Sequence, residues 1–99
     1  MVRTREEVLQ ALEDRRQTLR EMGVRKLGLF GSVARGDARE ESDLDFVVEF
    51  ERKSFDAYMN LKLFLEGLFD CRVDLVLADG IKPRLKPVIL DEAVYAQGL

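Results

Sequence analysis

Two neighbouring stretches decide the fold: Leu-Gly-Leu-Phe-Gly-Ser-Val-Ala-Arg-Gly over residues 27–36, and Ser-Asp-Leu-Asp-Phe-Val-Val over residues 42–48. The apolar half of the first predicts a strand over residues 24–30 that is covered on both faces. This strand should end in a tight turn at Gly31 and lead into a short helix. The second stretch alternates apolar and acidic side chains, which predicts a further strand running to about Phe50.

Three aspartates fall where a folded chain seldom places carboxylates. Asp43 and Asp45 are two residues apart, so on a strand they point to the same face with Cα atoms ~7 Å apart. Asp74 lies inside a third apolar run, predicted as a strand over residues 72–77. If the third strand lies beside the second, Asp74 completes a carboxylate cluster suited to Mg²⁺ together with waters and phosphates. The alternative is that the three carboxylates are unrelated: Asp43 caps a turn, Asp45 pairs with a surface arginine and Asp74 lies on a sheet edge.

The turn after the first strand is suited to an anion. Glycine at position 31 lets the backbone approach a phosphate closely, and the Ser32 hydroxyl and the first helix amides are donors. Arg35 and Arg39 follow and are placed to add positive charge, although both also fit the description of solvated surface arginines. Phosphate donors and metal-binding carboxylates on adjacent strand ends together predict a nucleoside triphosphate site.

The remaining segments complete an α/β (α+β) domain. Thr4 and Glu7 form a predicted capping box that begins a first helix, and Gly23 ends it. A second long helix is predicted from the Ser54 cap to about Phe69, with an apolar stripe that includes Phe55 and is expected to face the core. A helical segment over residues 82–90 and a short edge strand over residues 91–95 follow. The expected order is α-β-α-β-α-β-α, a small mixed sheet packed on helices, in one domain over residues 1–99.

Composition removes several function classes. The 99 residues include 16 Lys plus Arg, 19 Asp plus Glu, no His and one Cys, and the net charge is −3. Serine-histidine catalysis, histidine zinc sites and an intramolecular disulfide are therefore excluded. The mild acidity argues against direct nucleic-acid binding. No apolar run approaches the ~20 residues that span a bilayer, so we expect a cytoplasmic protein without a membrane partner.

The spaced pattern of Gly31-Ser32, Asp43-Leu44-Asp45 and Asp74 resembles the signature of polymerase beta-type nucleotidyltransferases. More narrowly, it resembles the minimal nucleotidyltransferase (MNT) domains encoded beside HEPN-domain proteins, and the resemblance extends through the tail, residues 81–95. It implies a polymerase beta-like fold. It also implies that Gly31 and Ser32 hold the nucleotide, to which the position of Arg35 adds positive charge. Asp43 and Asp45 would bind two Mg²⁺ ions, and Asp74 would help to bind one ion and to activate the attacking hydroxyl.

The resemblance further implies an antitoxin of a type VII-like toxin–antitoxin system, which transfers AMP from ATP to a tyrosine of a HEPN ribonuclease toxin. The short chain is consistent with this activity, because a protein acceptor can supply the missing wall of a cleft. Two alternatives stay open. One is a non-catalytic antitoxin that acts by binding and occlusion, and the other is a small-molecule nucleotidyltransferase.

Overall fold

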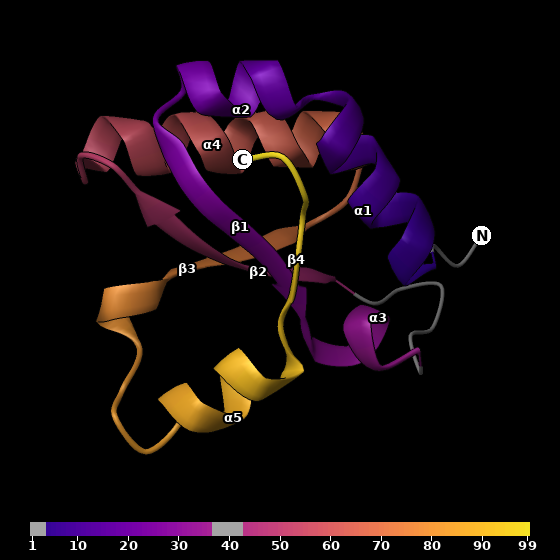
Figure 1. Cartoon of the computed structure of the whole chain (residues 1–99), viewed down its shortest axis with the longest axis vertical. Coiled ribbons are helices and arrows are strands. Elements are labelled where there is room, and N and C mark those ends of the chain that lie inside the picture. The colour runs from indigo at the N-terminus through magenta and orange to yellow at the C-terminus, as the bar shows by residue number, and fades with distance from the viewer. Residues whose placement is uncertain (1–3, 37–42) are drawn as a thin grey trace.

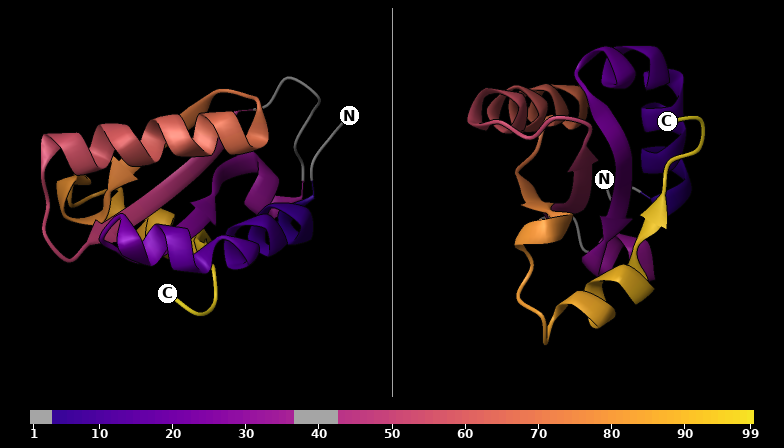
Figure 2. Two further views of the ribbon diagram at one scale, coloured as in Figure 1. Left: turned by 90° about the horizontal axis from the view of Figure 1, so that it is seen from above. Right: turned by 60° about the vertical axis from the view of Figure 1, so that its left-hand side comes forward.

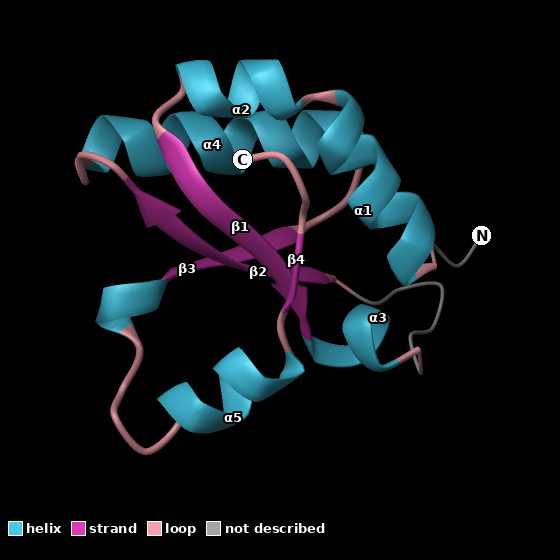
Figure 3. Cartoon of the chain, in the orientation of Figure 1, coloured by secondary structure: helices cyan, strands magenta, loops and turns pink. Residues whose placement is uncertain are grey.

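The computed structural model describes residues 4–36 and 43–99, which form a four-stranded mixed sheet with helices (Figures 1 and 3). The sheet order is β3-β2-β1-β4, with β1 antiparallel to β2 and β4, and β2 parallel to β3. The elements in chain order are α1 (Arg5–Asp14), α2 (Arg16–Glu21), β1 (Val24–Phe30), α3 (Gly31–Arg35), β2 (Leu44–Phe50), α4 (Phe55–Phe69), β3 (Val73–Leu77), the 3-10 turn η1 (Ala78–Gly80), α5 (Lys86–Glu92) and β4 (Val94–Tyr95). The predicted fold class is confirmed.

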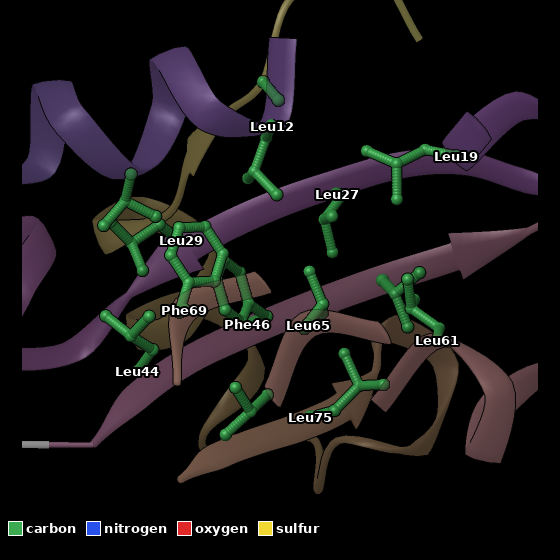
Figure 4. Close-up of a cluster of buried hydrophobic side chains, with 14 of the residues drawn as sticks. Leu12, Leu19, Leu27, Leu29, Leu44, Phe46, Leu61, Leu65, Phe69 and Leu75 are labelled. Carbon is green, nitrogen blue, oxygen red and sulfur yellow. The ribbon is translucent and has the colours of Figure 1, made fainter. Parts of the chain in front are cut away.

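The two faces of the sheet are covered differently. Helices α1, α2 and α4 lie side by side over one face, whereas α5 lies apart from them, toward the other face (Figures 1 and 2). The first face carries the core, in which leucines from α1, α2 and α4 meet the strands and the rings of Phe46 and Phe69 stack with their centroids 6.0 Å apart (Figure 4). Within residues 4–36 and 43–99, no helix is long and apolar enough to cross a membrane.

The start of the chain forms two helices, so the prediction of one continuous first helix was wrong. The capping box is present, because Thr4 Oγ1 accepts a hydrogen bond from the Glu7 amide at 3.1 Å and Glu7 Oε1 accepts one from the Thr4 amide at 3.2 Å. The helix breaks at Arg15, which ends α1 and begins α2. Leu12 and Leu19, on either side of the break, are both fully buried. The bend lets both helices follow the curved surface of a twisted sheet.

The tail also differs from its predicted boundaries. The last helix runs from Lys86 to Glu92 rather than over residues 82–90, and the edge strand is shortened to Val94–Tyr95. Pro87 stands in the first helical turn, where its missing N–H removes no intrahelical hydrogen bond, so the helix begins there. The shift places Asp91 and Glu92 in the helix instead of the strand. Phe55 was expected in the core and is 77% exposed, because it is the first residue of α4.

The stacked ring pair generates a stability prediction. Phe46 is fully buried at the centre of the core, so Phe46→Ala leaves a cavity and should lower the free energy of unfolding by about 3–5 kcal/mol. Urea denaturation followed by circular dichroism measures this loss. Phe55→Ala is the matched control, since its exposed ring should change stability by no more than about 0.5 kcal/mol. Equal losses in the two variants would contradict the placement of the core.

Candidate functional site

The turn from β1 into α3 brings backbone into contact with a carboxylate. Gly31 has φ of 78°, in the left-handed region that favours glycine. A Cβ atom added there would collide with the carboxylate of Asp45, lying 3.0 Å from its Cγ and closer still to Oδ2. The absence of a side chain at position 31 therefore lets the end of β1 lie directly against the first acidic residue of β2.

The carboxylates meet on the face of the sheet that the three core helices leave open. Register places Asp45 between Phe30 of β1 and Asp74 of β3, directly opposite each. Neighbouring strands are about 4.8 Å apart, so the Asp45 and Asp74 side chains are cross-strand neighbours on one face. Asp43 lies two residues before Asp45 and is exposed, as is Asp74. The prediction that the third strand lies beside the second is confirmed, and β3 is also an edge strand of the sheet.

The electrostatics at Asp45 are those of a crowded anionic site. Burial first, and then the negative charges of Asp74 and Asp43, raise the pKa of Asp45 to about 6. Arg35 opposes this rise, and Glu92 adds to it. A cation beside Asp45 would offset this negative charge and lower the electrostatic free energy of the folded state.

The donor chemistry fits Mg²⁺, because carboxylate oxygens are the protein ligands that this ion accepts. In residues 4–36 and 43–99, no group of three or more acidic or cysteine side chains is already arranged to hold a metal ion. Mg²⁺ in nucleotide sites ordinarily takes one or two carboxylates and completes its shell with waters and phosphate oxygens. The three aspartates thus supply suitable ligands, and their assignment as the metal site stays a prediction.

Arg35, the last residue of α3, forms an ion pair with Glu92 at the end of α5. The distance from Arg35 Nη1 to Glu92 Oε1 is 2.8 Å, and both side chains are partly exposed. Glu92 was missed as a site residue, because the predicted edge strand over residues 91–95 gave no reason to bring it to α3. Nothing in the sequence distinguishes Glu92 from its acidic neighbour Asp91.

The short helix α3 is also tied to α1. Arg5 Nη1 donates a hydrogen bond to the Ala34 carbonyl at 3.2 Å, and Gly36 ends α3 in the left-handed conformation. Ser32, in the first turn of α3, is partly buried, and the first amides of a helix lack intrahelical acceptors. Their assignment to a bound phosphate stays a prediction. The predicted contribution of Arg39 lies outside the described residues.

Known proteins resemble this chain in sequence and in fold. Residues 6–96 match the family model of the nucleotidyltransferase domain. The chain is 42% identical to the protein adenylyltransferase MntA of Thermococcus cleftensis over 94 residues, which span 93% of this chain and 95% of the relative. A solved structure described as a candidate minimal nucleotidyltransferase is 44% identical, superposes with a TM-score of 0.72, and is matched over 87% of this chain and 93% of its own.

A further solved structure, of a tri-AMPylated HEPN toxin in complex with MNT antitoxin from Shewanella oneidensis, shares the fold. It has a TM-score of 0.64 and 22% identity, over 92% of this chain and 73% of that one. At this identity the likeness concerns the fold alone.

The raised pKa of Asp45 predicts how stability changes with pH. The folded state holds the Asp45 proton up to about pH 6, whereas the unfolded chain releases it near 3.8, so ionisation in this interval weakens the fold. Asp45→Asn removes the penalty. Because the side chain is partly open to water, we expect a gain of only about 1 kcal/mol at pH 7.5 without Mg²⁺. The gain should disappear at pH 4, where Asp45 is protonated in the folded wild type.

Urea titrations of the wild type and the Asn variant at both pH values measure this difference. Comparing the two proteins cancels the titration of the groups that do not interact with Asp45. A loss of stability at pH 7.5 would instead assign Asp45 a role in holding the fold together.

Proposed function

The chain belongs to the nucleotidyltransferase domain family, and on that premise we propose that it is an antitoxin that transfers AMP from ATP to a tyrosine of a HEPN ribonuclease toxin. Family membership makes it a nucleotidyltransferase. The choice of AMP and of a protein acceptor is supported by the 42% identity to a protein adenylyltransferase along nearly its full length. The HEPN acceptor is supported by the shared fold of an MNT antitoxin bound to an AMPylated HEPN toxin.

The observation that carries the proposal is the contact between Gly31 and Asp45. It joins a turn suited to phosphate with a carboxylate suited to a metal ion, and the β2–β3 register adds Asp74 beside them. Transfer of a nucleotidyl group requires these parts within reach of one phosphorus atom. The lack of histidine is no obstacle, because phosphoryl transfer depends on positioning and charge stabilisation rather than on covalent work by the protein.

In the proposed reaction, the Gly31 and Ser32 amides and the Ser32 hydroxyl bind the triphosphate, and Arg35 adds positive charge. Asp43 and Asp45 would hold the Mg²⁺ ions, which when bound neutralise the charge on the phosphates. Asp74 accepts the proton of the attacking tyrosine hydroxyl. The tyrosine oxygen forms a bond to the α-phosphorus, the bond from that phosphorus to the bridging oxygen breaks, and diphosphate leaves with the electron pair.

Intact-mass spectrometry tests the proposal. Wild-type protein mixed with ATP, Mg²⁺ and the HEPN protein of the neighbouring gene should add one or more adenylyl groups to that protein. Asp43→Asn and Asp45→Asn should each abolish the addition, because each removes a carboxylate charge at the site. Asp79→Asn is the matched control, since this exposed aspartate lies beyond the other end of β3 from Asp74, pairs with Lys53 at 2.7 Å and should leave transfer unchanged.

Two outcomes would contradict the proposal. Full neutralisation of the toxin with no change in mass would indicate an antitoxin that acts by occlusion. Labelling of a small molecule, with the toxin mass unchanged, would indicate a small-molecule nucleotidyltransferase.

Glu92 provides a second test of the nucleotide site. Its carboxylate pairs with Arg35, so a bound triphosphate would compete with Glu92 for the guanidinium. Glu92→Gln removes one negative charge and should tighten ATP binding by up to about fivefold, the range of a partly exposed ion pair. Isothermal titration calorimetry measures the affinity. Arg35→Ala should weaken binding, and weaker binding in Glu92→Gln as well would mean that Glu92 orients Arg35 instead of competing for it.

A further inference from the structure

A pocket lies beside Asp74, outside the residues assigned above. It has a volume of about 490 Å³ and opens between the edge strand β3 and the segment that leads through α5. We call it the edge pocket, and it is lined by Tyr58, Leu75, Val76, Leu77, Gly80, Ile81, Lys82, Leu85 and Ile89. Most of these side chains are apolar, so the pocket suits an apolar group.

Through Val76, the edge pocket reaches the face of the sheet that carries Asp74. Val76 lines the pocket and follows Asp74 by two residues on β3, so both side chains point to the same side with Cα atoms about 7 Å apart. Asp74 itself is exposed on this edge. A side chain seated in the pocket therefore brings its neighbouring residues within reach of the Asp74 carboxylate.

The outer edge of β3 is partly closed to another strand. The Tyr58 hydroxyl of α4 donates a hydrogen bond to the Leu75 carbonyl at 2.6 Å. Glu66, also on α4, accepts one from the Val73 amide at 3.4 Å. These hydrogen bonds use the backbone carbonyl and amide groups of β3 through which an added strand would pair. A partner at this edge is thus expected to bind through side chains in the pocket rather than by extending the sheet.

The rim of the edge pocket combines apolar and basic groups. Leu85 lines the pocket and is 44% exposed, whereas Val88 is 56% exposed and does not line the pocket but lies about one helical turn beyond Leu85 on α5, at the rim. Lys82, Arg84 and Lys86 surround Leu85 in the sequence, three positive charges within five residues of a chain whose net charge is −3. An apolar centre with a charged rim is typical of a protein interface. The matching partner surface has an apolar anchor flanked by carboxylates.

We propose that the edge pocket is where the acceptor protein docks, with an apolar side chain in the pocket and acidic residues against Lys82 and its basic neighbours. Docking there presents the acceptor hydroxyl to Asp74. This inference rests on the proposed function for the identity of the partner, and it adds the surface that the partner uses. Binding and AMP transfer are separate measurements, so the two proposals can fail separately.

The experiment uses Leu85→Asp, Val88→Asp and the matched control Leu63→Asp. All three side chains are exposed, so each variant should fold. Leu63 is 60% exposed and lies on α4, whereas Leu85 and Val88 lie in the segment at α5 that borders the pocket. Affinity for the neighbouring HEPN protein is measured by isothermal titration calorimetry with a catalytically inactive Asp43→Asn background, and ATP affinity is measured in parallel. We expect Leu85→Asp and Val88→Asp to weaken the complex about tenfold or more, with Leu63→Asp and ATP binding unchanged.

Charge reversal tests the rim. Lys82→Glu should weaken the complex at low salt and reduce its salt dependence, because it removes one attractive contact with an acidic partner. The docking surface is overturned if both pocket variants bind like the wild type, if Leu63→Asp weakens the complex as much as they do, or if Lys82→Glu tightens it. These affinity measurements do not need AMP transfer. If the toxin binds but is not modified, the proposed function is overturned, and the affinities of the variants still test the docking surface.

Discussion

The site depends on one close approach, the Gly31 backbone against the carboxylate of Asp45. No other residue allows it, because Gly31 combines a left-handed backbone with a missing side chain whose place is taken by the Asp45 carboxyl group. Through this contact the end of β1, the start of α3 and the start of β2 are held at one corner of the sheet. Each group with a proposed role reaches the corner through one of these segments or through the strand paired with β2.

The hydrophobic core offsets the electrostatic cost of placing carboxylates close together at this corner. Helices α1, α2 and α4 pack over one face of the sheet, where the stacked Phe46 and Phe69 rings anchor β2 to α4 (Figure 4). Burial on this face stabilises β2, while its other face carries Asp45 with a raised pKa. A strand whose core face is apolar can thus support, on its other face, an anionic site that by itself opposes folding. A bound cation would remove part of that opposition.

The edges of the sheet are bordered by α5 and α4, and each helix makes side-chain contacts there. Helix α5 closes one side through the ion pair between Arg35 and Glu92, and its other end forms the rim of the edge pocket. Helix α4 partly closes the outer edge of β3, because Tyr58 donates a hydrogen bond to the Leu75 carbonyl and Glu66 accepts one from the Val73 amide. A small domain has little interior for a deep cleft. The partner-facing chemistry that we propose therefore lies where the sheet ends, on the strand that carries the exposed Asp74.

The sequence by itself determined the three longer strands, the long helix α4, the capping box at Thr4 and the candidate site residues other than Glu92, because strand alternation and capping are local properties of the chain. It missed the break at Arg15 and the true bounds of α5, which depend on packing against a twisted sheet and on Pro87 within a helix. Only the tertiary structure decided that Asp45 faces Asp74 and that Glu92 reaches Arg35. These pairs are 29 and 57 residues apart, and no local pattern records a contact between distant segments.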